Sequence, residues 1–319
     1  MGRIFIGIDL GGTNTKIGLF NSELELICKT SIATKEEMGP ADVVGRIGDT
    51  IEKLLTKNNL TIDAVDALGI GSPGPLSVGE GLIIAPPNLP RFRNTPLRDM
   101  VSNRFGKPAV LDNDANVACL GEYILGAGKG SGNMVFYTLG TGIGGGIISN
   151  GQLLHGSADN AAEIGHSIVY PNGRECGCGQ KGCLEAYASA TSMVKRTLEA
   201  IEAGGQSSLR ELFEKQGEIS CKDIYEHSAA GDELARKITD ETAEALAISC
   251  VNMLHITEPT KMVFAGGVIA AGDMLLNRIR HFFNEYIWSL KKETVQICFA
   301  TLGEDAGIIG AAALAREAI

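Results

Sequence analysis

The 319-residue chain lacks the features that mark several classes of protein. It contains no basic run, and its formal net charge is −10. Because a general nucleic-acid binder presents a basic patch, we expect no nucleic-acid partner. No apolar stretch of about 18 residues is free of charges and glycines, and no secretory signal opens the chain, so we expect no membrane span or export. These absences favour a cytoplasmic protein that acts on small molecules.

The eight cysteines show no extracellular pattern either. Three are clustered within residues 176–183. The other five stand singly among apolar neighbours, as reduced core cysteines do: Cys28, Cys119, Cys221, Cys250 and Cys298. Without a signal peptide, this distribution indicates a reducing compartment.

The order of predicted elements indicates a repeated α/β unit. With 44% hydrophobic and 21% charged residues, the chain is long enough for two ordinary domains. Three strand-like segments are followed by alternating helices and strands up to residue 125, which is the order of a ribonuclease-H-like unit. After the glycine-rich residues 126–132 the same theme restarts, with strands near 134–138, 147–149, 262–265 and 295–300. Helices are expected at 185–203, 209–214, 220–229, 232–256, 272–290 and 305–316.

Two glycine-rich loops, Asp9–Lys16 and Leu139–Gly146, are the most informative feature. Glycines let backbone N–H groups approach a phosphate closely. A Rossmann or Walker loop opens onto a helix, whereas strand-like sequence follows each loop here. We therefore predict two hairpin turns that hold the phosphate tail of a nucleotide across a cleft, through Gly11, Gly12 and Gly140.

The run Leu111–Asn116 places four polar side chains at a predicted strand-to-helix junction. Aspartate and asparagine are favoured helix N-caps, which would account for one of them. Phosphoryl transfer needs a carboxylate that orients and deprotonates the attacking hydroxyl. Since an ordinary aspartate is ionised at neutral pH, it can accept that proton. We predict Asp114 as the general base.

A histidine and three cysteines have a spacing that suits zinc. His166, Cys176, Cys178 and Cys183 form a Cys3His set for tetrahedral coordination, with glycines between them that permit tight turns. Four protein ligands predict a structural site. A disulfide or buried free thiols are the alternatives, although a reducing compartment and the short Cys176–Cys178 spacing oppose a disulfide.

Two glutamates bracket this cluster. Glu163 precedes His166 by three residues, and Glu185 follows Cys183 by two. Closing the metal site would bring both carboxylates to one patch and leave the second N–H of His166 able to donate. Such a set matches the hydroxyls of a sugar ring, although isolated surface glutamates are common.

Other residues suit a nucleotide. Asp9 is expected to hold Mg²⁺ through water, and Thr13 to bond a phosphate oxygen. Lys16 offers a positive charge, or is a solvated strand lysine. The segment Phe264–Val268 ends a predicted strand with two glycines, against which a flat ring could lie.

Together these motifs resemble the ROK family of sugar kinases and repressors, within the actin–hexokinase superfamily. The resemblance runs from Asp9 to Ala311, and the pattern from Glu163 to Glu185 is its most specific part. It implies an α/β, two-lobed actin/hexokinase-like fold of duplicated ribonuclease-H-like units, with a cleft between the lobes. The lobes are expected to be 1–117, completed by the helix 305–319, and 118–304, which carries the zinc-stabilised sugar loop.

The resemblance implies ATP-dependent phosphorylation of a hexose, usually glucose, at its 6-hydroxyl with Mg²⁺, by a homodimer or homotetramer. By position, Asp114 matches the catalytic base. The residues that match sugar ligands are Gly74, Asn88, Asn113, Asp114, Glu163, His166 and Glu185. Those that match nucleotide contacts are Thr13, Thr141, Gly142, Gly266 and Gly267, and those that match the zinc site are His166, Cys176, Cys178 and Cys183.

Two departures from the family pattern concern the sugar pocket. Ala162 and Ala190 stand where the family usually has glycines, and an added methyl could narrow the pocket. A kinase for an N-acetylhexosamine, mannose or fructose therefore remains an alternative. Because Asp9 follows Met1 closely, with no helix-turn-helix domain before it, we expect a kinase rather than a non-catalytic sugar-sensing regulator. An actin- or chaperone-like ATPase would have no use for the zinc cluster.

Overall fold

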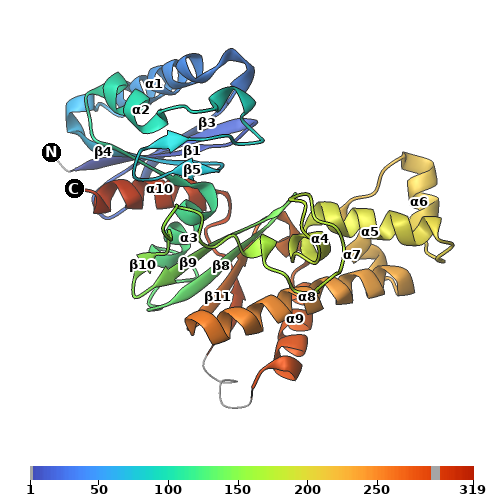
Figure 1. The fold of residues 1–319 in the computed structure, drawn as a ribbon. Coiled ribbons are helices and arrows are strands. Elements are labelled where there is room, and N and C mark those ends of the chain that lie inside the picture. The colour runs from blue at the N-terminus through green and yellow to red at the C-terminus, as the bar shows by residue number, and fades with distance from the viewer. Residues whose placement is uncertain (1–2, 289–294) are drawn as a thin grey trace. The chain divides into compact units, whose positions relative to one another are not determined.

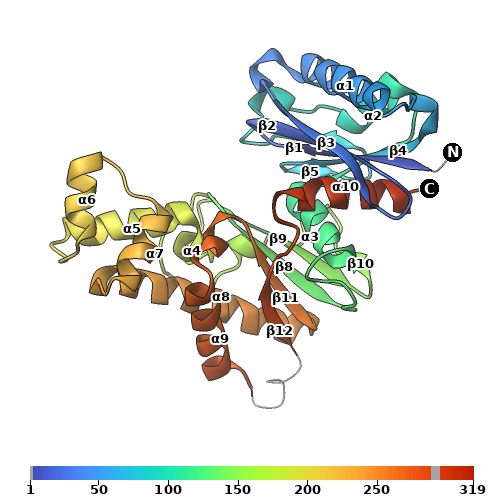
Figure 2. The same ribbon diagram turned by 180° about the vertical axis from the view of Figure 1, so that it is seen from behind.

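A computed structural model describes residues 3–288 and 295–319, which form two compact units (Figures 1 and 2). The first unit contains the chain up to Gly130, the segment Leu153–Ala161 and the C-terminal segment Thr301–Ile319. The second contains Ser131–Gln152 and the described part of Ala162–Ala300. Each unit is built on one five-stranded sheet.

The sheet of the first unit has the order β3-β2-β1-β4-β7. Antiparallel pairing joins β1 to β2 and β2 to β3, and parallel pairing joins β1 to β4 and β4 to β7. Helices α1 and α2 cover one face, and α10 and α3 cover the other (Figure 1). The bounds are β1 (Ile4–Leu10), β2 (Asn14–Phe20), β3 (Leu26–Ala33), β4 (Val65–Ser72), β7 (Ala109–Asn113), α1 (Pro40–Lys57), α2 (Leu97–Phe105), α3 (Asp114–Ile124) and α10 (Ala306–Glu317).

Helix α10 packs directly on the strands because both surfaces are built from small residues. A Cβ atom added to Gly7 would lie 1.9 Å from the carbonyl oxygen of Ile308, and one added to Gly69 would lie 1.8 Å from that of Ala311. The buried face of α10 is largely alanine. A larger side chain at Gly7 or Gly69 would therefore push the helix away from the sheet.

The second sheet has the order β10-β9-β8-β11-β12. Strand β8 pairs antiparallel with β9 and parallel with β11, and β11 pairs parallel with β12, as the corresponding strands of the first sheet do. This correspondence confirms the predicted repetition. Its strands are β8 (Met134–Leu139), β9 (Ile143–Ser149), β10 (Gln152–Leu153), β11 (Lys261–Ala265) and β12 (Gln296–Phe299). Its helices are α4 (Glu185–Ala188), α5 (Ala190–Glu202), α6 (Leu209–Gln216), α7 (Cys221–Ala229), α8 (Glu233–Thr257) and α9 (Asp273–Tyr286).

The structure changes three details of the predicted elements. The single helix expected over 185–203 is divided at Ser189, whose hydroxyl accepts from Ser192 N at 3.1 Å and caps α5. The short hairpin of β5 (Leu76–Ser77) and β6 (Leu82–Ile83) was not expected. Helix α9 ends at Tyr286; the expected continuation over 289–290 lies outside the described residues. A capping box opens α7: Ser220 Oγ accepts from Asp223 N at 3.2 Å, and Asp223 Oδ2 accepts from Ser220 N at 2.7 Å.

The second glycine loop is shorter than the sequence suggested, because β9 begins at Ile143 and contains Gly144–Gly146. A Cβ atom at Gly145 would lie 2.7 Å from the carbonyl oxygen of Ala162. These glycines therefore let the segment that carries Glu163 pack against the strand. Ala162 itself has a φ of 63°, a conformation that favours glycine.

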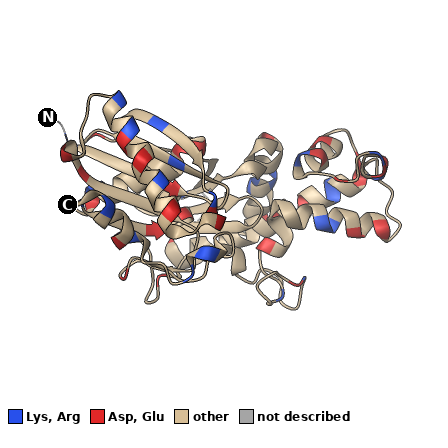
Figure 3. Cartoon of the chain, turned by 90° about the horizontal axis from the view of Figure 1, so that it is seen from above, with Lys and Arg blue, Asp and Glu red and all other residues tan. Residues whose placement is uncertain are grey.

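Charged residues of both signs are interspersed along the helices, whereas the strands carry few of them (Figure 3). The two large hydrophobic clusters accordingly lie between sheets and helices. Among the helices that the structure describes, none is both long enough and apolar enough to cross a bilayer.

Glu122, near the end of α3, has a fully buried carboxylate that joins two distant parts of the first unit. It accepts hydrogen bonds from Ala127 N at 2.8 Å, Thr301 N at 3.0 Å and Leu302 N at 2.7 Å. A buried carboxylate is stable only when its oxygens are bonded in this way. These bonds, with the packing of α3 on α10, explain why residues 118–130 belong to the first unit.

Replacing Glu122 by alanine should lower the free energy of unfolding by about 3 kcal/mol, because a buried side chain is removed and three backbone N–H groups in partly buried hydrogen bonds lose their acceptor. Glu122→Gln, which keeps one acceptor oxygen, should cost less. Urea unfolding followed by circular dichroism measures both values. Glu214→Ala, at an exposed position of α6, is the control, and an equal effect of the two alanine variants would contradict this role.

Ala162→Gly should raise the free energy of unfolding by about 1 kcal/mol, because alanine is strained at positive φ. The matched change Ala190→Gly, at the first position of α5, should lower it by about 0.5–1 kcal/mol. Chemical unfolding of the two variants under one set of conditions gives the comparison. Effects of the same sign would be inconsistent with the backbone conformation of Ala162.

Candidate functional site

The predicted site residues fall into two groups, one in each unit. The first unit holds Asp9, Gly11, Gly12, Thr13, Lys16, Gly74, Asn88, Asn113 and Asp114. The second holds Gly140, Thr141, Gly142, Glu163, His166, Cys176, Cys178, Cys183, Glu185, Gly266 and Gly267.

The first glycine loop is a hairpin turn between β1 and β2, as predicted. Gly11 N donates to Asn14 O at 3.0 Å, which closes the turn. A Cβ atom at Gly12 would lie 2.7 Å from the carbonyl oxygen of Asn88. The turn predicted to contact phosphate therefore lies against a residue predicted to contact sugar.

The ammonium group of Lys16 is paired with Glu304 rather than only with solvent. Its Nζ lies 3.1 Å from Glu304 Oε2 and 3.2 Å from the carbonyl oxygen of the same residue. The Glu304 side chain is 88% exposed, so the pair contributes little stability. Its main effect is to join β2 to the chain that leads into α10.

The carboxyl group of Asp9 has a raised pKa. Burial raises its pKa to about 6, the charge of Asp114 adds to the effect, and Lys16 opposes it. The influence of Asp114 means that the two carboxylates are close enough to repel each other. A pair of this kind suits a bound cation.

The β7–α3 junction places Asp114 at the first position of a helix. The N-cap is Asn113, whose Oδ1 accepts from Ala115 N at 2.9 Å and Asn116 N at 3.4 Å. Capping thus accounts for Asn113, and the half-buried Asp114 also accepts from Ala115 N, through Oδ1 at 2.8 Å. A Cβ atom at Gly74 would lie 3.3 Å from Asn113 Nδ2, so the structure brings these two predicted sugar ligands together.

Asp112 and His155 form an ion pair that the sequence did not reveal. The buried Asp112 carboxylate lies 2.6 Å from His155 Nε2. It also accepts from Asn113 N at 2.7 Å and Asn116 Nδ2 at 3.0 Å. An aspartate inside a buried strand signals that a partner exists, but the sequence does not say which residue it is.

In the second unit, Glu185 lies against the second glycine turn. Its Oε2 accepts from Ile143 N at 2.8 Å, and a Cβ atom at Gly142 would lie 2.5 Å from the same oxygen. Gly266, which follows β11 and has a φ of 91°, lies close to the backbone of Leu139 at the end of β8. A Cβ atom added to Gly266 would lie 2.4 Å from the carbonyl oxygen of Leu139. The structure thus brings together the turn predicted to contact phosphate, the predicted nucleotide contact Gly266 and one predicted sugar ligand, Glu185.

The four predicted zinc ligands converge, with their ligand atoms all within 4.8 Å of one another. His166 Nδ1 lies 3.8 Å from Cys176 Sγ, so this nitrogen faces the cluster. The sulfur atoms of Cys178 and Cys183 are 3.7 Å apart, too far for a disulfide bond of about 2.05 Å. The backbone N–H of Gln180 lowers the pKa of Cys178 to about 7, which favours the thiolate that binds metals.

The two glutamates lie differently relative to this cluster. Glu185 Oε1 is 3.7 Å from Cys176 Sγ, so its carboxylate lies between the cluster and the glycine turn. Glu163 is exposed and precedes η4 (Ile164–His166), the short helix that presents His166.

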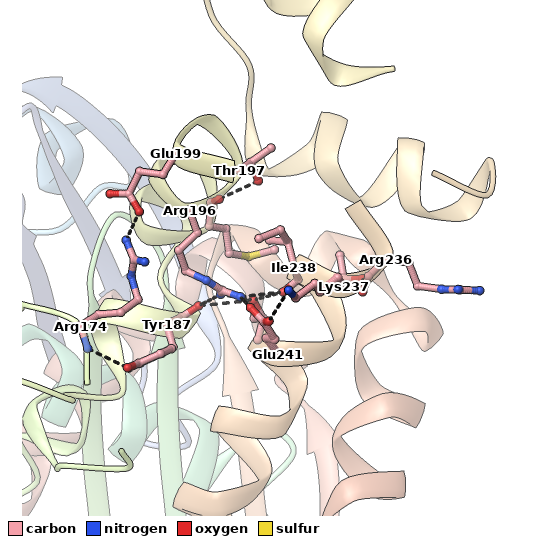
Figure 4. A network of polar contacts seen from close by, with 12 residues as sticks. Arg174, Tyr187, Arg196, Thr197, Glu199, Arg236, Lys237, Ile238 and Glu241 are labelled. Atoms are coloured by element: carbon pink, nitrogen blue, oxygen red, sulfur yellow. Dashed lines mark hydrogen bonds and ion pairs between the residues drawn. The ribbon is translucent and has the colours of Figure 1, made fainter. Parts of the chain in front are cut away.

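A network that the sequence did not suggest holds α4, the short helix that begins with Glu185 (Figure 4). The buried Arg196 of α5 donates to the carbonyl oxygen of Tyr187 at 2.5 Å and pairs with Glu241 of α8. The hydroxyl of Tyr187 accepts from Arg174 N at 2.8 Å, in the cysteine-bearing loop. The network therefore joins the loop that carries the three clustered cysteines, together with α4, to the long helix α8.

The chain also resembles known proteins over its whole length. A family model described as the ROK family matches residues 5–318. A glucokinase of Halalkalibacterium halodurans is 36% identical, over 99% of this chain and 96% of the relative. A glucokinase of Thermotoga maritima is 38% identical, over 98% of each.

A solved structure supports the same relationship. A ROK family glucokinase from Streptomyces griseus, in complex with glucose and AMPPNP, has a TM-score of 0.78 and 32% identity over 98% of this chain and 99% of that one. This similarity, with the repeated strand order, confirms the predicted α/β fold of the actin and hexokinase type. The chain belongs to the ROK family.

Proposed function

We propose that this protein transfers the γ-phosphoryl group of ATP to the 6-hydroxyl of a hexose, with glucose as its preferred substrate. The observation that carries the proposal is the half-buried Asp114 at the first position of α3, beside a second carboxylate, Asp9. The relatives named glucokinase, at 36% and 38% identity, support glucose.

In the proposed reaction, Asp114 orients the 6-hydroxyl and accepts its proton as the oxygen bonds to phosphorus. The transition state of phosphoryl transfer carries charge on the phosphoryl oxygens, so the protein mainly positions and stabilises. Backbone N–H groups around Gly12 and Gly142 would bind the phosphates. Thr13 and Thr141, both exposed at the turns, would add hydroxyl donors.

We assign sugar recognition to the predicted sugar ligands of both units. Asn113 and Gly74 adjoin each other, which suits contact with one hydroxyl. Glu185 is held by Ile143 N, and His166 Nδ1 faces the cysteines, which leaves Nε2 on the other side of the ring. Glu163 is the exposed acceptor that precedes His166.

The residues present fit Mg²⁺ and Zn²⁺. Asp9, whose pKa is raised partly by Asp114, would hold Mg²⁺ through water, and the ion would neutralise phosphate charge. His166 and the three cysteines would hold Zn²⁺ as a structural ion. We further propose a reducing cytoplasm as the site of action and a homodimer or homotetramer as the assembly.

Asp114→Asn and Asp114→Ala should lower kcat by about 10²–10⁴-fold, because the general base is lost, while glucose binding persists. A coupled assay of ADP release measures turnover, and titration calorimetry measures sugar binding. Asp63→Asn, an exposed change in the same unit, is the matched control. Near-normal turnover in the Asp114 variants would refute the assignment.

The same assay with a panel of sugars tests the substrate. Glucose should give the highest kcat/KM among glucose, mannose, fructose, N-acetylglucosamine and N-acetylmannosamine. A preference for an N-acetyl sugar would replace glucose without changing the reaction. Sugar binding without any ADP release would instead indicate a sugar-sensing regulator.

Metal analysis should find about one zinc ion per chain, because the four ligands form one tetrahedral set. Cys178→Ser should lose the zinc and raise the KM for sugar or unfold the second unit. Cys28→Ser, outside the cluster, should do neither, since its partner Asn58 can donate to a hydroxyl as well. A chain without zinc and with unchanged stability after chelation would exclude the site.

A further inference from the structure

Asp112 is a buried charge that none of the roles assigned above uses. Its side chain is 0% exposed, and burial of an ionised carboxylate is costly unless every oxygen is paired. Oδ1 accepts from Asn113 N and Asn116 Nδ2, and Oδ2 faces His155 Nε2. Both oxygens of this carboxylate therefore have partners within the first unit. Asp112 directly precedes Asn113 in the chain.

His155 belongs to a segment that is fixed to the first unit although its neighbours in sequence belong to the second. The segment Leu153–Ala161 is held by the His155–Asp112 pair and by Asp159 Oδ2, which accepts from Val78 N at 2.8 Å. Ala161 N donates to the carbonyl oxygen of His155 at 2.9 Å and closes the segment on itself. The segment that carries the imidazole is therefore fixed at two points of the first unit, Asp112 and Val78.

The bonds of Asp112 act on the backbone that carries the proposed base. Asn113 N bonds to Asp112, and the side chain of Asn113 caps α3 at Ala115 N. Asp114 lies between these two bonds. Since a displacement of about 1 Å at a reacting group can cost 10²-fold in rate, a change at Asp112 would reach Asp114 through this peptide.

We propose that Asp112 and His155 form a positioning pair for Asp114: the imidazolium neutralises and orients the buried carboxylate, which in turn fixes the β7–α3 junction. The inference rests on the proposed kinase function. Neither residue touches the substrate in this role. The pair acts by holding the base where the sugar hydroxyl reacts.

The charge state of His155 fits this role. Its hydrogen bond to Asp112 raises the pKa of His155 above the usual value, and the carboxylates of Asp112 and Asp159 both favour the imidazolium. The pairing is complete below the ordinary histidine pKa, and it is lost as the pH rises through the raised value. We therefore expect the wild-type kcat to decline on the alkaline side with this titration.

The test compares His155→Ala with His155→Gln. Glutamine places an amide N–H at a similar reach and donates to Asp112 without titrating. His155→Ala should lower kcat by about tenfold or more, and His155→Gln should recover it to within about threefold. In His155→Gln the alkaline decline of kcat should be absent. His281→Gln, on α9 of the second unit, is the matched control and should match the wild type.

Two results would overturn the pair as a positioning device. One is a kcat of His155→Ala within twofold of the wild type. The other is an equal loss of kcat in His155→Ala and His155→Gln, with both variants keeping the pH profile of the wild type. A merely structural role of His155 would leave that profile unchanged.

A measurement independent of catalysis separates this inference from the proposed function. Histidine titration by NMR should give His155 a pKa above the ordinary histidine value, and Asp112→Asn should return it toward that value. An unshifted His155 would refute the pair even in an active kinase. Wild-type protein that phosphorylates no hexose would refute the proposed function, while the NMR result would still decide whether the pair exists.

Discussion

The carboxylate of Glu185 is the contact on which the site residues of the second unit depend. One oxygen accepts from Ile143 N at 2.8 Å, and the other lies 3.7 Å from Cys176 Sγ. A single side chain therefore connects the glycine turn to the cluster of His166 and three cysteines. A Cβ atom at Gly142 would occupy nearly the same space as this carboxylate, 2.5 Å from its oxygen. The packing of the protein itself therefore requires bare backbone at this turn.

Glu185 is held in place by the helical core rather than by its own helix. Helix α4 has four residues, too few to be stable alone. Arg196, 4% exposed, bonds to the carbonyl oxygen of Tyr187 and pairs with Glu241 of the 25-residue helix α8. A buried guanidinium is costly unless it is paired in this way. The long helix therefore gives the short one its fixed position.

The first unit has a similar arrangement, but its buried charged side chain is a carboxylate instead of a guanidinium. There a buried carboxylate, Asp112, is paired with His155 and bonds to the backbone next to Asp114. In each unit, a buried charged side chain bonds to the element that carries a carboxylate of the proposed site, Asp114 in one unit and Glu185 in the other. Both carboxylates thus lie on elements that the core fixes, and the proposed reaction depends on such positioning.

The sequence by itself determined the features that depend on neighbouring residues. Strand-like residues after each glycine loop specified hairpins, apolar spacing specified α1, and the close spacing of His166 with three cysteines specified one cluster. Only the tertiary structure decided the contacts between distant segments. His155 and Asp112 are 43 residues apart, and Arg196 and Glu241 are 45 apart. Local propensity carries no information about such partners, because buried charges are paired only when the packed core brings them together.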